Sequence, residues 1–199
     1  MKPCPLPRIT MRSLTLVPAT LFLMLFSLKT VAADIEETVQ ACAACHGDQG
    51  IPIDTTIPVI WGQLEGYLYI QLRDYKNGAR KNAIMTQIAS TLERKEMFDI
   101  AAYFAAKPWP DLQQPRASAS DANRAATADS SIGCTGCHLE KYQGTGTAPR
   151  LAGQSEAYLL KNMEDFTSGS RGNNPGMTSL MKATGAGDFP SLAAYLAGL

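Results

Sequence analysis

Two five-residue strings constrain this chain of 199 residues more than any other feature. Both have the pattern Cys-x-x-Cys-His, one at 42–46 and the other at 134–138. The chain contains only five Cys and two His, and the strings hold four of the Cys and both His. These six residues are Cys42, Cys45, His46, Cys134, Cys137 and His138. The strings therefore predict two sites of the same chemistry.

The sequence around the two strings is duplicated. The second string begins 92 residues after the first, and further stretches match at an offset of 91 or 92. The matching stretches are Pro58–Leu68 with Pro149–Leu159, Asp74–Arg80 with Asp165–Arg171, and Ala101–Tyr103 with Ala193–Tyr195. A repeat of this kind predicts two similar domains rather than one larger core.

The first 33 residues have the pattern of a secretory signal peptide. A basic start precedes an apolar run at 14–28, and small residues follow at 31–33. The alternative is a retained membrane anchor, but the apolar run is shorter than the roughly 20 residues that span a bilayer. We therefore expect an exported chain that is cleaved near Ala33.

The chain after this segment divides into three parts. We expect a first domain at 34–107, a linker at 108–131 and a second domain at 132–199. The linker contains three Pro and is rich in Ala, Ser and Asp, which is typical of a connecting segment. A short helix at 120–128 is the alternative for part of it.

Hydrophobic spacing predicts that both domains are helical. We expect helices at 34–44, 65–75 and 156–166, and a further helix that begins at a capping box of Ser90 and Glu93. A last helix is expected to begin near Asp188, because the Pro at position 190 fits the first turn. No stretch alternates as a strand does, so the expected fold class is all-α.

The pattern Cys-x-x-Cys-His is typical of covalent c-type haem attachment. The two thiols bond to the haem, and the adjacent His lies under the iron. A zinc site built from Cys and His is one alternative. Disulfides are another, since an exported chain meets an oxidising compartment. The repeat favours two separate centres of three residues each, and therefore two covalently bound haem c groups.

Both His are already used, so neither iron has a second His as its sixth ligand. The sixth position is then taken by a Met or by another side chain, or it stays open. Met85 matches Met177 at an offset of 92, so these two are the expected axial ligands. Met181 competes with Met177, and Met97 has no Met counterpart. Thioether ligation raises the reduction potential and leaves no open site for a substrate. We therefore expect electron transfer and no catalytic residues.

Several other residues of the repeat have two interpretations each. The carbonyl groups of Pro58 and Pro149 either accept the ring N–H of the two His, as metal-bound His usually requires, or belong to plain turns. The repeated pair Arg80 and Arg171 either binds haem propionates or lies in solvent.

Two aromatic positions are also of interest. Tyr67 and Tyr158 either contact the haems or pack in the core. Trp61 has Ala152 as its counterpart, so it is a candidate for making the two haem pockets different.

Taken together, the chain resembles the diheme class I cytochromes of the cytochrome c4 type. The resemblance covers nearly all of 34–199 and rests on the haem strings, on 58–67, on 78–80 before Met85 and on 100–103, with their repeats. It implies two tandem class I cytochrome c domains, each wrapped around a covalently bound haem with His and Met ligands. It also implies a periplasmic electron carrier of a respiratory chain.

The sequence departs from this family in two places. Leu139 follows the second string where the family usually has Gly, and the linker lacks the Gly-x-x-Leu-[Tyr/Phe] helix that normally precedes that string. These departures resemble the diheme cytochrome subunit of flavocytochrome c sulfide dehydrogenase, which is the alternative function. A diheme peroxidase is a third possibility, and it requires one iron to lose its axial ligand.

The expected partners follow from these resemblances and from charge. They are cytochrome oxidase or another reductase, quinol–cytochrome c reductase, and in the alternative a flavoprotein subunit, with peripheral membrane association as an option. Residues 34–199 carry 14 basic and 18 acidic side chains, a formal net charge of −4. An acidic surface favours basic protein partners, and nothing in the sequence indicates nucleic-acid binding.

Overall fold

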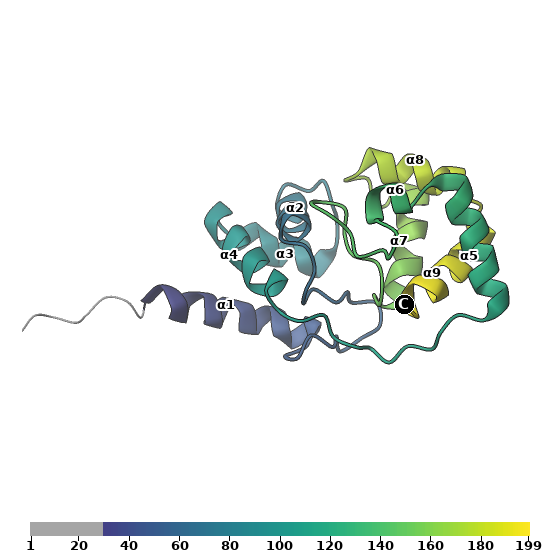
Figure 1. Ribbon diagram of the computed structural model, residues 1–199. Coiled ribbons are helices and arrows are strands. Elements are labelled where there is room, and N and C mark those ends of the chain that lie inside the picture. The colour runs from purple at the N-terminus through teal and green to yellow at the C-terminus, as the bar shows by residue number, and fades with distance from the viewer. Residues whose placement is uncertain (1–29) are drawn as a thin grey trace, which may run out of the picture.

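The computed structural model describes residues 30–199, with side chains from residue 35 onward. Within this part, all regular elements are helices and the only β-type pairing is an isolated bridge between Thr145 and Ala148 (Figure 1). The expected all-α fold class is confirmed. The predicted signal peptide, residues 1–33, lies outside the described residues except for its last four.

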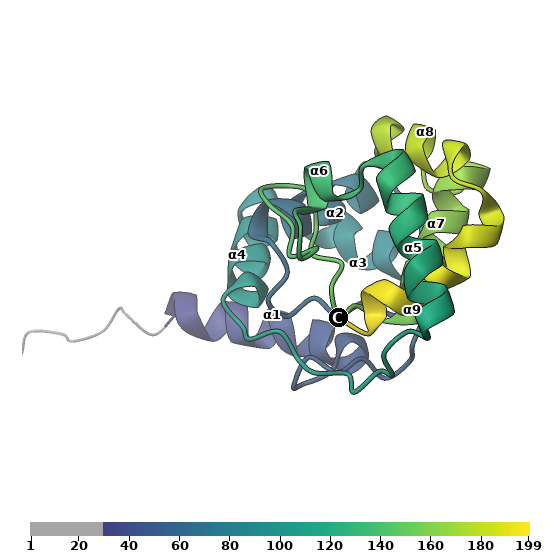
Figure 2. The same cartoon turned by 45° about the vertical axis from the view of Figure 1, so that its right-hand side comes forward.

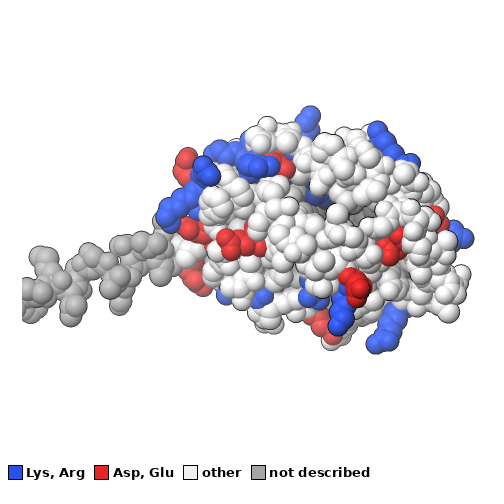
Figure 3. Space-filling view, turned by 45° about the horizontal axis from the view of Figure 1, so that its top comes forward, with Lys and Arg blue, Asp and Glu red and all other residues white. Residues whose placement is uncertain are grey.

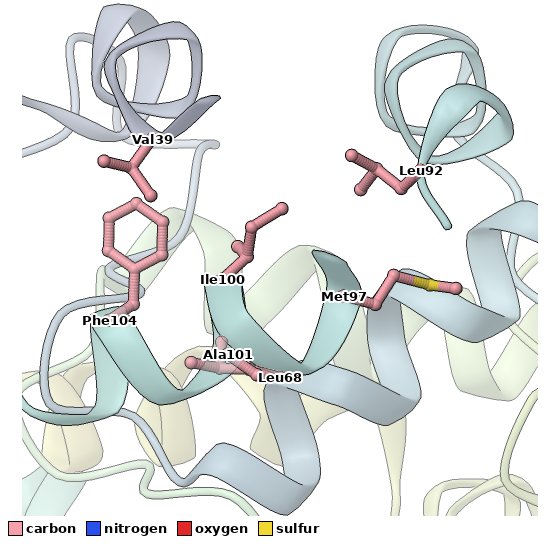
Figure 4. Close-up of a cluster of buried hydrophobic side chains, with 7 residues drawn as sticks. All are labelled: Val39, Leu68, Leu92, Met97, Ile100, Ala101 and Phe104. Carbon is pink, nitrogen blue, oxygen red and sulfur yellow. The ribbon is translucent and has the colours of Figure 1, made fainter. Parts of the chain in front are cut away.

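The first half of the structure contains four helices packed around one core. They are α1 (Thr30–His46), α2 (Glu65–Lys76), α3 (Ala83–Thr91) and α4 (Arg94–Ala105). Helix α2 packs against α3 and α4, and α1 packs against α4. Figure 4 shows the buried cluster that these helices share. Its members are Val39, Leu68, Leu92, Met97, Ile100, Ala101 and Phe104.

The second half is built on the same plan. Its elements are α5 (Ala119–Ile132), α6 (Thr135–His138), α7 (Glu156–Ser168), α8 (Pro175–Ala183), the 3₁₀ turn η1 (Ala186–Asp188) and α9 (Phe189–Ala197). Helix α9 packs against α5 and α7, and α7 packs against α8. The extended segment 107–118 joins the two halves, as Figures 1 and 2 show. The two halves lie side by side.

Most predicted helices are present, and one predicted start is wrong. Helices α1, α2 and α7 cover the stretches expected to be helical, and α9 begins beside Asp188 as expected. The capping box, however, lies three residues later than the sequence predicts. The side chain of Glu96 accepts from the backbone N–H of Glu93 at 2.6 Å. Ser90 lies within α3, where its hydroxyl donates to the carbonyl of Gln87.

Half of the expected linker is a helix. Residues 108–118 have no helix, but α5 occupies Ala119–Ile132 and is longer than the short alternative at 120–128. The Ser118 side chain accepts from the N–H of Asp121 and so caps α5. Ala125, 1 % exposed, and Ala128 are buried in a cluster with residues of α9. Small side chains let the two helices lie close together, and they leave no strong apolar stripe in the sequence.

The surface carries charges of both signs. On the face shown in Figure 3, basic and acidic side chains are interspersed and much of the face carries neither. None of the helices within residues 30–199 is long and apolar enough to span a bilayer.

Candidate haem-binding sites

The first Cys-x-x-Cys-His string forms the carboxyl end of α1. His46 is buried, and its Nδ1 lies 2.8 Å from the carbonyl oxygen of Pro58. Burial lowers the pKa of His46, and the Pro58 carbonyl opposes this shift only in part. The imidazole is therefore neutral at pH 7, with Nδ1–H donating to the carbonyl. This leaves the lone pair of Nε2 available for a metal ion.

The second string forms α6 and has the same arrangement. His138 is also buried, and its Nδ1 lies 2.8 Å from the carbonyl oxygen of Pro149. Burial again lowers the pKa of this imidazole. Of the two interpretations of these prolines, the one in which their carbonyls hold the His rings is confirmed. A backbone carbonyl in this place fixes the orientation of a metal-binding His.

Among residues 30–199, no disulfide joins the four Cys of the strings. Burial raises the pKa of Cys42, and burial together with Asp129 raises that of Cys134 to about 11. Across residues 30–199, no group of three or more His, Cys, Asp and Glu side chains gathers in a way that suits a metal ion. The described residues of the two strings therefore do not come together as one zinc site.

The backbone just after the second string is strained. Leu139 has φ 64° and ψ 163°, a region that only Gly enters readily. After the first string, Gly47 has φ 86° and avoids this cost. The departure noticed in the sequence therefore has a structural counterpart beside His138.

Met85 and Met177 occupy equivalent positions in α3 and α8. Each is the third residue of its helix, and each backbone N–H donates at 3.0 Å to the side chain of the N-cap Asn. Both side chains are half-buried. Met181, by contrast, is 4 % exposed and packs in the core between α7, α9 and α5. Met85 and Met177 therefore share a helix position and a degree of burial, whereas Met181 is a core residue, and Met177 packs against the buried cluster that contains Met181.

Arg80 and Arg171 are buried, so the interpretation that they lie in solvent is wrong. Arg80 donates to the hydroxyl of Tyr158 at 3.0 Å, and Arg171 donates to the hydroxyl of Tyr67 at 3.2 Å. Each guanidinium thus reaches the opposite half of the molecule. Both also donate to Gln71. The two Tyr are therefore polar partners at the boundary between the halves and are not simple core residues.

This pair of cations has no carboxylate partner among the described residues, since the ion pairs there involve other side chains. Burial raises the pKa of Tyr67, but the guanidinium groups of Arg171 and Arg80 outweigh it and lower the pKa to about 8. Buried charges are normally paired. The boundary is consequently a positive site that fits an anionic group such as a haem propionate.

Trp61 has surroundings that differ from those of its counterpart in the second half, and its role in making the two haem pockets different stays a prediction. Its Nε1 is buried and has no hydrogen-bond partner among the described residues, and Lys107 Nζ lies 5.6 Å from its ring centroid. The counterpart in the second half, Ala152, is small and buried.

The sequence interpretation did not include four amide side chains at the boundary. They are Gln63, Gln71, Gln154 and Asn162, and each hydrogen-bonds a residue of the opposite half. Gln63 matches Gln154, and Gln71 matches Asn162, at the same offset of 91. Their recurrence within the repeat was the available signal.

Comparison with known proteins finds relatives that match most of the chain. No protein-family model matches the chain. The chain is 33 % identical over 184 residues to cytochrome c4 of Pseudomonas aeruginosa, which covers 84 % of this chain and 88 % of that protein. It is 32 % identical over 196 residues to the thiosulfate dehydrogenase electron acceptor of Stutzerimonas stutzeri, covering 88 % and 91 %.

Solved structures agree with this result. The crystal structure of reduced cytochrome c4 from Pseudomonas stutzeri superposes with a TM-score of 0.73 at 29 % identity. The match covers 84 % of this chain and 98 % of that one. The tandem arrangement of two class I cytochrome c domains that the sequence predicts is thereby confirmed.

Proposed function

Because the chain belongs to the cytochrome c4 family, we propose that it carries electrons in the periplasm for a respiratory chain. It is a diheme c-type cytochrome with two covalently bound haem c groups, and it is an electron carrier, not an enzyme. Export and the periplasmic location rest on the signal-peptide pattern of residues 1–33.

The residue roles are part of the proposal. Cys42 and Cys45 attach the first haem, and Cys134 and Cys137 attach the second. His46 and His138 are the proximal ligands, supported by their burial and by the Nδ1 bonds of 2.8 Å to prolyl carbonyls. This duplicated geometry is the observation that carries the proposal.

The distal ligands are Met85 in the first half and Met177 in the second. Their support is the equivalent place near the start of α3 and α8 and the core position of Met181. Arg80 and Arg171 hold haem propionates, supported by their burial without a carboxylate partner among residues 30–199. When bound, the haems supply one-electron redox chemistry, and the protein positions them and sets their potentials.

Haem content tests these assignments directly. A pyridine haemochrome assay together with intact mass is expected to give two haems per exported chain. Replacing both Cys of one string, as in Cys42→Ala with Cys45→Ala, is expected to leave one. The matched variant is Cys134→Ala with Cys137→Ala. Two haems in either variant, or one in the unaltered chain, contradict the assignment.

A second candidate concerns the electron donor. The thiosulfate dehydrogenase electron acceptor of Stutzerimonas stutzeri is similar to this chain along most of its length. This similarity favours a donor that oxidises an inorganic sulfur compound. Stopped-flow reduction by a thiosulfate dehydrogenase tests it. Rapid reduction supports this donor, and a rate no faster than that with an unrelated reductase rules it out.

A further inference from the structure

Two buried Gln side chains cross the boundary and form hydrogen bonds with the backbone of the opposite half. Gln154 accepts from the N–H of Val59 at 2.8 Å and donates to the carbonyl of Val59 at 3.0 Å. Gln63 accepts from the N–H of Arg150 at 2.9 Å and donates to its carbonyl at 3.0 Å. Both Gln are 3 % exposed. The same contact is therefore made twice, once in each direction.

Val59 and Arg150, whose backbone these Gln bind, directly follow the prolines whose carbonyls accept from the His rings. The N–H of Val59 and the carbonyl of Pro58 belong to one peptide group. His46 Nδ1 contacts the oxygen of this group at 2.8 Å, while Gln154 contacts its N–H. The planar, conjugated peptide thus links the imidazole of one half to an amide of the other. In the second half, the same link joins His138 to Gln63.

The orientation of each Gln amide is fixed by its neighbours. The Oε1 atom of Gln154 also accepts from the N–H of Ser155 at 2.9 Å, and that of Gln63 from the N–H of Leu64 at 3.0 Å. Two N–H groups therefore face each amide oxygen, and the amide cannot be reversed. Val59 is 1 % exposed, so water does not replace the Gln at this peptide.

We propose that Gln154 and Gln63 are positioning residues, each of which tunes the proximal His of the opposite half. This inference rests on the proposed function, in which His46 and His138 bind the irons. A peptide whose N–H is bonded has a more polarised carbonyl, because hydrogen bonds in a chain strengthen one another. A stronger acceptor at Nδ1–H makes the imidazole a more basic ligand. Basic ligation favours ferric iron and lowers the potential.

The test replaces each Gln with Met, which keeps the length of the side chain and removes its hydrogen bonds. The two haem potentials are measured by spectroelectrochemical titration, and each haem is assigned to its half by NMR. Gln154→Met is expected to raise the potential of the haem on His46, and Gln63→Met that of the haem on His138. Each shift is expected to be several-fold in the ferric–ferrous equilibrium, where a tenfold change is about 59 mV.

A matched control is available in the connecting segment. Gln114 makes hydrogen bonds of 3.0 and 2.9 Å to the backbone of Gln154 and Glu156 but touches neither prolyl peptide. Gln114→Met is expected to leave both potentials unchanged. If a Gln154 or Gln63 variant moves the potential in its own half, moves both equally or moves neither, the inference is wrong.

A measurement on the unaltered protein covers the case in which the variants fail to fold. In the reduced, diamagnetic state, a scalar coupling across the hydrogen bond is expected between the Val59 amide nitrogen and the Gln154 side-chain carbonyl carbon. Absence of this coupling overturns the inference. A haem count other than two per chain defeats the proposed function instead, so the two failures are distinguishable.

Discussion

Met177→Ala and Met181→Ala are expected to have opposite effects, although the two residues are four apart in one helix. Met181 is 4 % exposed among side chains of α5, α7, α8 and α9. Truncation to Ala removes three heavy atoms, which is about 2.4 kcal/mol of transfer free energy at roughly 0.8 kcal/mol per methylene-sized group. The cavity left behind adds to this, within the about 2–5 kcal/mol seen for Met→Ala in cores.

A loss of about 3 kcal/mol corresponds to a fall of about 12–24 °C in Tm for a domain of this size. Met181→Ala is expected to show this fall and to retain both Met-to-iron charge-transfer bands. Met177 is half-buried, so its truncation removes less packing. Met177→Ala is expected to abolish the band of the second haem. Thermal unfolding followed by circular dichroism, and absorption of the oxidised protein, measure the two quantities.

The first half supplies the controls. Met97 is as buried as Met181, so Met97→Ala is expected to lower Tm and keep both bands. Met85→Ala is expected to remove the band of the first haem. If Met181→Ala removes a band while Met177→Ala keeps both, the argument from burial and helix position is refuted. A missing band in the unaltered protein would show instead that one iron has no Met ligand.

Three other predictions follow from strain, hydrogen bonding and titration. Leu139→Gly is expected to raise the free energy of unfolding in urea by about 1 kcal/mol. The substitution relieves about 1–3 kcal/mol of backbone strain, which exceeds the entropic cost of Gly of about 0.5–1 kcal/mol. A lower urea midpoint would contradict this prediction. Arg171→Leu removes hydrogen bonds to four side chains. At about 0.5–1.5 kcal/mol for each bond, the free energy of unfolding is expected to fall by about 2–6 kcal/mol. Arg171→Lys has fewer correctly placed donors and is expected to recover only part of this loss. Burial lowers the pKa of His46 and His138 below 6.5, and binding of Nε2 to the proposed iron opposes protonation in the same direction. The folded chain therefore binds fewer protons than the unfolded chain, and its stability is expected to decline as pH falls below 6.5. Urea midpoints that are flat with pH would contradict this.

Local patterns predicted the parts of this protein that depend on neighbours in the chain. Each haem string spans five residues, and the last helix has its Pro in the first turn beside Asp188. Each prolyl carbonyl lies 12 or 11 residues along the chain from the His that it contacts. Helix α5 was expected to be linker because its buried face consists of Ala125 and Ala128, which give little hydrophobic signal. The cap at Ser118 alone does not predict a helix here, because α5 is stabilised mainly by its packing on α9.

The boundary between the halves was harder to predict. The partners of Gln63, Gln154, Arg80 and Arg171 across it lie 78 to 104 residues away. The repeat identified equivalent residues but not which of them meet, since that depends on how the halves dock. Burial of both Arg follows from the docking, which is why solvent exposure was an equal alternative in the sequence.

The reciprocal Gln contacts have a consequence for the origin of the chain. An interface in which each side makes the same contact on the other is isologous, and it is the kind that joins two copies of one subunit. Each half carries a Gln and also the peptide that the Gln of the other half binds. A single half therefore has both parts of the reciprocal contact. Fusion through 107–118 makes this association intramolecular and independent of concentration. Fusion also lets the two copies diverge, as Trp61 and Ala152 have done.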